Sequence, residues 1–238
     1  MSGFFLSKDS KSSLRRNVES VLLALLLAFT VRAFIFQPFK IPSSSMEPAL
    51  LVGDYIVVKK FAYGTRIPFS GIQIFDGGAI KRGDVVVFKR AERPGERKKN
   101  YFIKRVVATG GDAVQVRGRD IFVNGSKVTQ SYAGSHTADG GAAFERYLQR
   151  FGEKSVNVIY RKGLSSTYKG IASSAFRVPE GHVFLMGDNR DNSQDSRLWG
   201  TVSGRDVVGK AVIVHWSWSF KNSLLPKVRW ERIFSEIK

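Results

Sequence analysis

Three segments of the sequence place hydroxyl and amine side chains in settings where they could do chemistry. Residues 41–50 carry three consecutive serines between two prolines, residues 101–107 carry a lysine inside an apolar run, and residues 187–197 are dense in Asp, Asn and Ser. A serine attacks a carbonyl carbon only when a neighbouring base removes its proton. Each segment alone is more typical of a loop, a strand edge or a turn, so any chemistry depends on the three meeting in space.

A lysine can be such a base only in its neutral form. With the usual lysine pKa of about 10.4, well under ~1% of these side chains are neutral at pH 7, so burial must lower the pKa. Lys104 lies between the apolar pairs 102–103 and 106–107, which could desolvate it. A neutral amine also needs a hydrogen-bond partner that adds no charge, and the hydroxyl of Ser193 meets this requirement.

Together and in this order, the three segments resemble the type I signal peptidase family. Pro-Ser-Ser-Ser-Met at residues 42–46 matches the family's serine box, Lys-Arg-Val at 104–106 its lysine box, and residues 187–197 its Gly-Asp-Asn-Arg-Asp-Asn-Ser box. The resemblance extends from the apolar N-terminal run to about residue 214. It implies a serine endopeptidase that removes signal peptides from exported preproteins, cuts after small residues (Ala-x-Ala type), and works through an acyl-enzyme without a cofactor.

The resemblance also implies roles for single residues. Ser45 is implied as the nucleophile and Lys104 as the general base, while Ser43 and the backbone N–H of Ser45 would form the oxyanion hole. The supporting residues implied are Ser193, which would orient the lysine, and Asp195 and Arg197, which would form an ion pair. Shallow apolar pockets for the substrate are expected to be lined by Phe39, Ile41, Pro42, Met46, Leu50 and Ile103. No metal site is expected.

The histidines and the acidic cluster fit other kinds of site less well. A Ser-His-Asp triad would need His136, His182 or His215, but His182 lies in a turn and His215 in an apolar strand, settings that do not mark a base. The acidic cluster at 191–196 matches a calcium loop only at its first positions. Two classes stay open: another Ser-Lys peptidase, such as a pilin-processing enzyme or a self-cleaving repressor, and a catalytically silent, membrane-tethered binding protein.

The N-terminus is expected to anchor the chain in a membrane. An apolar run at residues 21–31 continues after Arg32 to Phe36, and basic residues precede it. A cleavable signal peptide is the alternative, but no Ala-x-Ala pattern follows the run. Because basic residues stay on the cytoplasmic side, we expect a single-pass protein of the bacterial cytoplasmic (inner) membrane. Its N-terminus would be cytoplasmic and its catalytic domain extracytoplasmic, on the periplasmic side.

Composition limits the partners. The 238 residues carry a formal net charge of +18 and no cysteine, which excludes thiol catalysis, disulfides and thiolate metal sites. The charge suits an anionic surface, but Lys and Arg are scattered through strand-like runs and turns, so a nucleic-acid partner is not expected. The expected partners are secretory preproteins and the anionic phospholipid membrane, with the protein translocon as a further candidate.

Short β-rich runs follow Pro38, and they must position the candidate residues. The runs expected to be strands are residues 55–58, 85–88, 102–108, 113–116, 183–186 and 207–216. Several follow Gly-Asp pairs typical of turns, at 53–54, 83–84, 111–112 and 187–188. Asn124-Gly125 predicts a two-residue hairpin turn. Residues 131–174 are rich in Gly, Ser, Ala and charge, with one helix candidate at 142–151.

These patterns predict a mainly β fold: an N-terminal transmembrane helix, then an antiparallel β-rich catalytic domain with a smaller inserted β/α subdomain. The predicted divisions are a basic N-terminus at 1–17, an anchor at 18–36, the catalytic domain at 37–120 and 175–220, the inserted subdomain at 121–174, and a basic C-terminal segment at 221–238.

Overall fold

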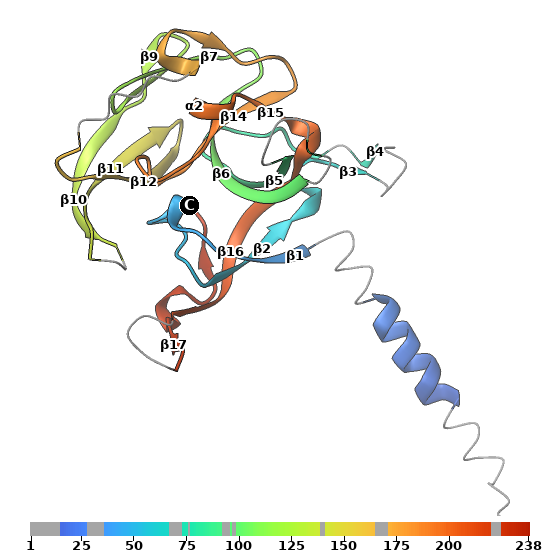
Figure 1. Ribbon diagram of the computed structural model, residues 1–238. Coiled ribbons are helices and arrows are strands. Elements are labelled where there is room, and N and C mark those ends of the chain that lie inside the picture. The colour runs from blue at the N-terminus through green and yellow to red at the C-terminus, as the bar shows by residue number, and fades with distance from the viewer. Residues whose placement is uncertain are drawn as a thin grey trace, which may run out of the picture.

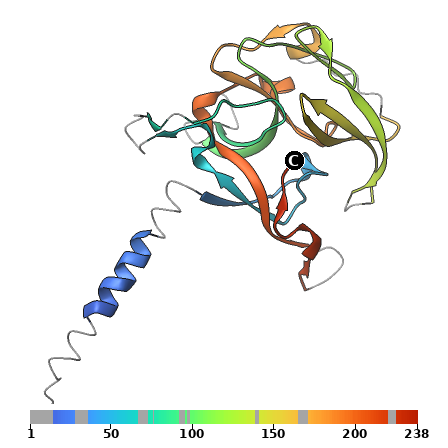
Figure 2. The ribbon, with the colours of Figure 1, turned by 180° about the vertical axis from the view of Figure 1, so that it is seen from behind.

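The computed structural model describes residues 15–27, 36–66, 73–75, 77–91, 96, 99–138, 141–164, 171–219 and 225–238. Within these ranges the chain folds mainly into antiparallel strands (Figures 1 and 2). The prediction of a mainly β fold is confirmed. Every run that was expected to be a strand is part of one.

The larger sheet has the strand order β1-β2-β16-β5-β6-β14-β15, and β17 and β18 pair with β16. Its strands are β1 (Phe36–Lys40), β2 (Asp54–Lys59), β5 (Val85–Ala91), β6 (Lys99–Thr109), β14 (His182–Met186), β15 (Val202–Ser203), β16 (Val207–Ser219), β17 (Lys227–Val228) and β18 (Ser235–Glu236). Alternate side chains of a strand point to opposite faces. Val85 and Val87 of β5 therefore enter one apolar core, and Val86 and Phe88 enter another.

Two smaller sheets lie beside the larger one, in the upper part of Figure 1. Their strand orders are β13-β7-β8-β9 and β10-β11-β12, and a separate ribbon pairs β3 with β4. The strands are β3 (Thr65–Arg66), β4 (Gln73–Phe75), β7 (Ala113–Arg117), β8 (Asp120–Val123), β9 (Ser126–Lys127), β10 (Gln130–Thr137), β11 (Ala143–Phe151), β12 (Lys154–Arg161) and β13 (Phe176–Arg177). A third core joins both small sheets to the ends of β6 and β14 through Val107, Val114, Val158 and Phe184.

Helical structure is sparse in the described part of the domain. It consists of the one-turn helix α2 (Ser196–Trp199) and the 3₁₀ helices η1 (Ser44–Met46), η2 (Lys60–Tyr63), η3 (Ile171–Ser173), η4 (Gly204–Asp206) and η5 (Trp230–Arg232). The domain boundary expected between residues 120 and 121 falls within β8.

The helix predicted at residues 142–151 is wrong, because this segment is strand β11. Phe144, Tyr147, Leu148 and Phe151 recur at intervals of three and four residues, a spacing that also suits a helix. β11 pairs with β10 on one side and with β12 on the other along its length. Pairing on both edges satisfies the backbone of β11 and outweighs local helix preference.

The predicted anchor is only partly described. Residues 15–27 are helical, and residues 28–35 lie outside the described residues. In the described ranges no helix is both long and apolar enough to span a membrane. The expectation that the helical span reaches Phe36 is wrong at that residue, because Phe36 begins β1. It pairs with Lys59 of β2, and its ring contacts Phe61 edge-on.

Three of the four Gly-Asp pairs form the predicted turns. Gly53, Gly83 and Gly111 have positive φ values of 88°, 85° and 85°. In each turn the aspartate accepts a hydrogen bond from the backbone N–H three residues earlier, as seen for Asp54 with Leu51, Asp84 with Lys81 and Asp112 with Thr109. The hairpin turn at Asn124-Gly125 is also confirmed, since Val123 pairs with Ser126 across it. The fourth Gly-Asp pair belongs to the candidate site.

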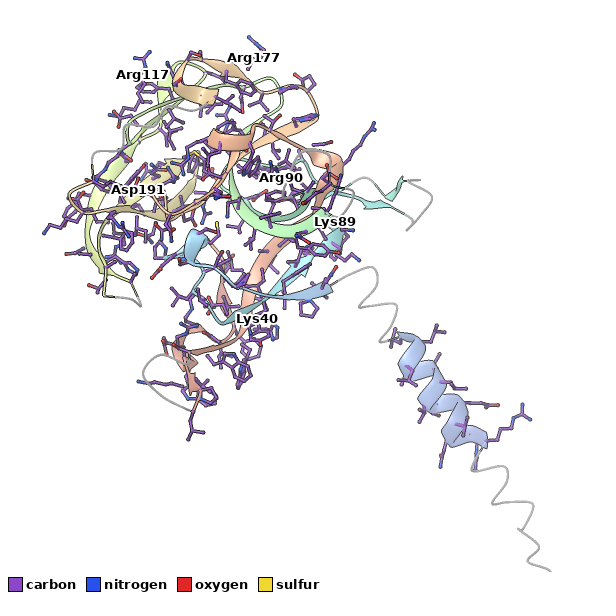
Figure 3. All side chains as sticks on the ribbon, viewed as in Figure 1. Lys40, Lys89, Arg90, Arg117, Arg177 and Asp191 are labelled. Atoms are coloured by element: carbon purple, nitrogen blue, oxygen red, sulfur yellow. The ribbon has the colours of Figure 1, made fainter. Side chains whose placement is uncertain are left out.

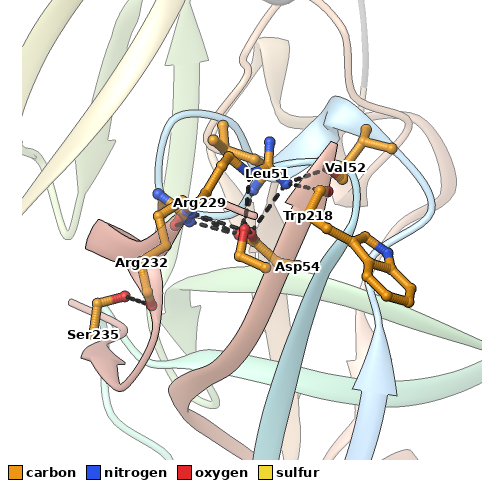
Figure 4. Close-up of polar contacts among 9 residues, drawn as sticks. Leu51, Val52, Asp54, Trp218, Arg229, Arg232 and Ser235 are labelled. Carbon is orange, nitrogen blue, oxygen red and sulfur yellow. Dashed lines mark hydrogen bonds and ion pairs between the residues drawn. The ribbon is translucent and has the colours of Figure 1, made fainter. Parts of the chain in front are cut away.

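A buried carboxylate ties the C-terminal segment to the larger sheet (Figure 4). Asp54 is fully buried at the start of β2 and accepts a hydrogen bond from Arg232 at 2.6 Å and from Ser217 at 2.7 Å. Arg229 lies 3.4 Å from the same carboxylate. Two guanidinium groups therefore compensate one buried negative charge, and residues 225–238 become part of the sheet.

Candidate active site

The serine run forms a tight loop between β1 and β2. The N–H of Ile41 donates to the carbonyl of Asp54 at 2.8 Å, and the N–H of Leu50 donates to the carbonyl of Met46 at 2.9 Å. Ile41, Met46 and Leu50 are buried in one core. These apolar anchors fix the loop, while η1 at its tip carries Ser45, which is 9% exposed.

Lys104 comes from the middle of β6, opposite Val86 of β5. Its side chain is 4% exposed. Burial lowers the pKa of Lys104 to about 8; the carboxylates of Asp195 and Asp188 partly oppose this shift, and Arg197 adds to it. At pH 7, one unit below that value, about a tenth of the molecules carry the neutral amine.

The loop and the strand bring serine and lysine into direct contact. The Nζ of Lys104 lies 2.6 Å from the Oγ of Ser45, across 59 residues of sequence. The Oγ of Ser43 lies 3.3 Å from the same oxygen. Both contacts have hydrogen-bond geometry. An amine with a lowered pKa, touching a serine hydroxyl in a largely dehydrated site, is an arrangement that can activate the serine.

Comparison with known proteins identifies the family of this site. The model of the family described as signal peptidase, peptidase S26, matches residues 14–216. The chain belongs to this family. It is accordingly a peptidase of signal-peptide processing, a hydrolase of the signal peptidase I type.

Several similar proteins share this assignment. A signal peptidase I of Pseudomonas fluorescens is 39% identical over 211 residues, which cover 84% of this chain and 72% of the relative. The signal peptidase I of Haemophilus influenzae is 34% identical, covering 100% of this chain and 81% of the relative. A crystal structure of a signal peptidase I from Enterococcus faecalis V583 covers 56% of this chain and 97% of its own, at 24% identity and a TM-score of 0.34.

The loop of residues 187–197 closes the site from the other side. The N–H of Asn189 donates to the carbonyl of Ser45 at 3.1 Å, and the side-chain amide of Asn192 donates to the hydroxyl of Ser44 at 2.9 Å. These contacts span about three fifths of the chain. The sequence motif contains both asparagines, but nothing in their spacing indicated which groups they would hold.

Gly187 differs from the three turn glycines. Its φ is not positive, and its role is set by space. A Cβ at this position would lie 2.3 Å from the Oγ of Ser193 and 2.5 Å from the carbonyl of Ser45, closer than atoms can pack. Glycine therefore lets the loop pass against the serine loop. The Gly-Asp pair at this position thus differs from the three turn pairs in the reason for its glycine.

Ser193 lies next to Ser45 but does not bond the lysine. Its buried Oγ has no hydrogen-bond partner among the described residues, so the bond expected between Ser193 and Lys104 is not formed. The hydroxyl faces the α-carbon of Gly187. An unsatisfied buried hydroxyl is destabilising, and such groups recur where a function retains them.

Two buried ion pairs flank the lysine. Arg197 binds Asp195 through two contacts of 2.8 Å, and Asp195 also accepts the N–H of Gly187 at 3.0 Å. Arg105, missed as a site residue, binds Asp188 through two contacts of 2.7 Å. Strand alternation places the Arg105 side chain on the face opposite Lys104. No local pattern around Arg105 predicts its partner, which is 83 residues away.

The six predicted pocket residues divide into two groups. Met46 and Leu50 are fully buried and Ile41 nearly so, which means that a substrate would reach them only if their neighbours moved. Ile103 is at the edge of burial with 9% exposed. Phe39 is partly buried against Tyr101, at a ring distance of 5.1 Å, and Pro42 is exposed. Phe39, Pro42 and Ile103 are therefore the accessible candidates.

None of the three histidines bonds Ser45 in the described structure. His136 contacts Glu47 at 2.9 Å, and His182 contacts the hydroxyl of Thr201 at 3.2 Å. The ring of His215 packs edge-on against Tyr55. A metal-binding group of three or more His, Cys, Asp or Glu is absent from the described residues.

The positive charge of the chain is not gathered at the site. Figure 3 labels Lys40 on β1 and Lys89 and Arg90 on β5, while Arg117 and Arg177 lie on the four-stranded sheet at the other end of the molecule. Basic side chains therefore occur on both the larger sheet and the four-stranded sheet.

Proposed function

We propose that the chain is a membrane-anchored serine endopeptidase that removes N-terminal signal peptides from exported preproteins through a Ser45–Lys104 dyad. The proposal rests on the 2.6 Å contact between the two side chains in a buried setting that lowers the lysine pKa. Membership of the signal peptidase family supplies the reaction class.

In the acylation step the neutral amine of Lys104 takes the proton of Ser45 as its Oγ attacks the scissile carbonyl. A tetrahedral intermediate forms and collapses, the C–N bond breaks, and the ammonium of Lys104 returns the proton to the leaving amine. The signal peptide is then held as an ester of Ser45. Water, deprotonated by Lys104, attacks the ester and releases a free carboxylate and the original serine.

The oxyanion of the intermediate needs donors placed in advance. Ser43 has its Oγ 3.3 Å from the nucleophile, which supports a hydroxyl donor beside the backbone N–H of Ser45. Donors of this type stabilise charge that develops only in the transition state. Ser193, which lies against the serine loop with its Oγ unpaired, is proposed to orient Lys104 after rotating about its own side chain, while the Asp195–Arg197 pair holds the loop.

Specificity for small residues before the cut is proposed to come from shallow apolar walls. Of the six candidates, Phe39, Pro42 and Ile103 are the ones that keep accessible surface and could form these walls. Deep pockets are not available behind them, because Ile41, Met46 and Leu50 fill the core. A large substrate side chain would have to displace packed residues. Binding it would therefore cost more free energy than binding a small side chain.

The anchor is proposed from sequence and charge. The apolar run at 21–31 follows basic residues, and part of it lies in the helix at residues 15–27. The basic side stays cytoplasmic, which puts Ser45 on the outer surface close to the membrane. Preproteins and anionic phospholipids are then the natural partners, with the translocon as a further candidate.

One experiment tests the function. The purified full-length protein in lipid vesicles is incubated with a preprotein, and the product is sequenced from its N-terminus. A single new N-terminus after a small residue, absent with Ser45→Ala, is expected. Failure of the wild-type protein to cleave any preprotein would favour a silent binding protein. Cleavage that persists in Ser45→Ala would refute the dyad.

A further inference from the structure

The serine loop carries a buried carboxylate, Glu47. Glu47 follows Ser45 by two residues and is 5% exposed. Its Oε1 lies 2.9 Å from the Nε2 of His136. A buried carboxylate is costly unless it is paired, and an ionised carboxylate only accepts hydrogen bonds, so Nε2 carries the hydrogen. The imidazole therefore satisfies Glu47 and attaches the serine loop to another element.

That element is the edge strand of the three-stranded sheet. His136 lies near the end of β10 and pairs with Phe144 of β11, and its ring lies 6.4 Å from the ring of Phe144. β11 in turn pairs with β12 along its length. The position of the imidazole is thus determined by a sheet and not by an isolated loop.

The same sheet holds the loop of residues 187–197. The N–H of Ile159 in β12 donates to the carbonyl of Asp188 at 2.9 Å, and the N–H of Arg190 donates back to Ile159 at 3.0 Å. The buried guanidinium of Arg190 also donates to the side chain of Gln149 in β11 at 2.6 Å. The loop is therefore joined to the edge of β12 by an isolated parallel β-bridge between Ile159 and Asn189.

Two hydrogen bonds of the serine loop thus connect it to the three-stranded sheet. One runs from Ser45 through Asn189 to β12, and the other runs through Glu47 and His136 to β10. Lys104 is placed separately, by β6 of the larger sheet. The larger sheet also holds the serine loop, through the buried side chains of Ile41, Met46 and Leu50. Attachment to the three-stranded sheet is therefore an additional constraint on the position of Ser45 relative to Lys104.

We propose that Glu47 and His136 are positioning residues that hold Ser45 against Lys104, and that the sheet β10-β11-β12 serves as a support for the active site. Neither side chain touches the reacting atoms. This inference rests on the proposed dyad. Loss of the contact should let the serine loop shift, and a displacement of about 1 Å in a reacting group can cost about 10²-fold in rate.

The test compares matched variants at position 136. His136→Leu removes the hydrogen bond, whereas His136→Gln keeps an N–H donor at a similar reach. Preprotein cleavage is measured as kcat and KM separately, with the melting temperature as the folding check. We expect His136→Leu to lower kcat by about 30-fold with KM within about twofold, and His136→Gln to retain kcat within about threefold of wild type.

Three further variants complete the design: Ser135→Ala, Glu47→Gln and the double variant Glu47→Gln/His136→Leu. Ser135→Ala, an exposed neighbour on β10, should leave kcat unchanged. In Glu47→Gln/His136→Leu the loss should be smaller than the product of the two single losses, because both act through one contact. If His136→Leu does not fold, His136→Asn, whose amide is too short to reach, replaces it.

The outcomes separate this inference from the proposed function. Unchanged kcat in His136→Leu, a change confined to KM, or an equal loss in Ser135→Ala would overturn the positioning role. If the wild-type protein cleaves no preprotein, the proposed function fails instead. Acylation of Ser45 by a p-nitrophenyl ester would still report the effect of position 136 on the nucleophile, with the same expected ratios.

Discussion

Lys104 and Arg105 are consecutive buried residues of one strand, yet their direct partners differ. Arg105 is fully buried, binds both oxygens of Asp188, and donates to the main-chain oxygens of Gly83 and Lys238 at 2.8 Å each. Lys104, on the opposite face, contacts the hydroxyl of Ser45 at 2.6 Å and has no salt bridge with a described carboxylate.

The difference shows that partners, more than burial, decide what a buried cation can do. A guanidinium does not lose its proton in proteins, and a bidentate carboxylate fixes its charge. An amine beside a neutral hydroxyl can lose its proton, and the burial of Lys104 favours that loss. One side of β6 therefore holds charge for stability, and the other side holds a group that can change its charge.

Replacing Lys104 by arginine should have the largest effect on activity. The variant keeps a positive charge but cannot supply a neutral base, so we expect kcat to fall by at least about 10³-fold. Preprotein cleavage and circular dichroism would measure activity and folding together. His182→Gln is the matched control and should retain activity within about threefold. Substantial turnover in a folded Lys104→Arg protein would remove lysine from the mechanism.

Replacing Arg105 by methionine tests the other side of the strand. The substitution leaves Asp188 buried without its cation, and breaking such a pair typically costs about 3–5 kcal/mol of unfolding free energy. Lys104→Met leaves no buried carboxylate without its salt-bridge partner, so it should lower the free energy of unfolding far less. Urea unfolding of the two variants measures the contrast. Equal destabilisation would show that the two cations have the same structural role.

The pH dependence of activity tests the role of Lys104 without a mutation. Because the pKa of Lys104 is lowered to about 8 and the neutral form is the base, activity should rise about tenfold per pH unit below that value and level off above it. Initial rates of cleavage between pH 6 and 10 would show this. A rate independent of pH from 6 to 9, or one that falls as pH rises, would contradict a lysine base.

Removing the hydroxyl of Ser193 should have the smallest effect and act in opposite directions on activity and stability. Ser193→Ala deletes a buried oxygen that has no partner among the described residues, so the melting temperature should rise by a few degrees. If the hydroxyl orients Lys104 during the reaction, kcat should fall about tenfold. A rise in stability with unchanged kcat would leave Ser193 without a catalytic role.

Local patterns predicted much of this molecule. Alternating apolar runs located the strands, Asn124-Gly125 located a hairpin, and Gly-Asp pairs located three turns, because each depends on neighbours in sequence. The same logic failed at residues 142–151, where helical spacing occurs in a strand paired on both edges. A local sequence pattern does not specify with which distant strands a segment pairs.

The candidate site was predictable as a set of residues but not as a structure. Ser45 and Lys104 were named from their segments, and the fold brings them into contact. The partners of Arg105, Glu47 and Arg190 were missed, because each lies 41 to 89 residues away. Side-chain pairing over such separations depends on the finished fold.

The contact between Asn189 and the serine loop should affect how late in folding the active site forms. Ser45 meets Lys104 across 59 residues, and the loop at Ser44 meets Asn189 across 145 residues. Contacts of high sequence separation close slowly, since long segments must lose their freedom first. We expect proteolytic competence to appear only at the end of folding, so that a newly made chain cannot cut its unfolded neighbours.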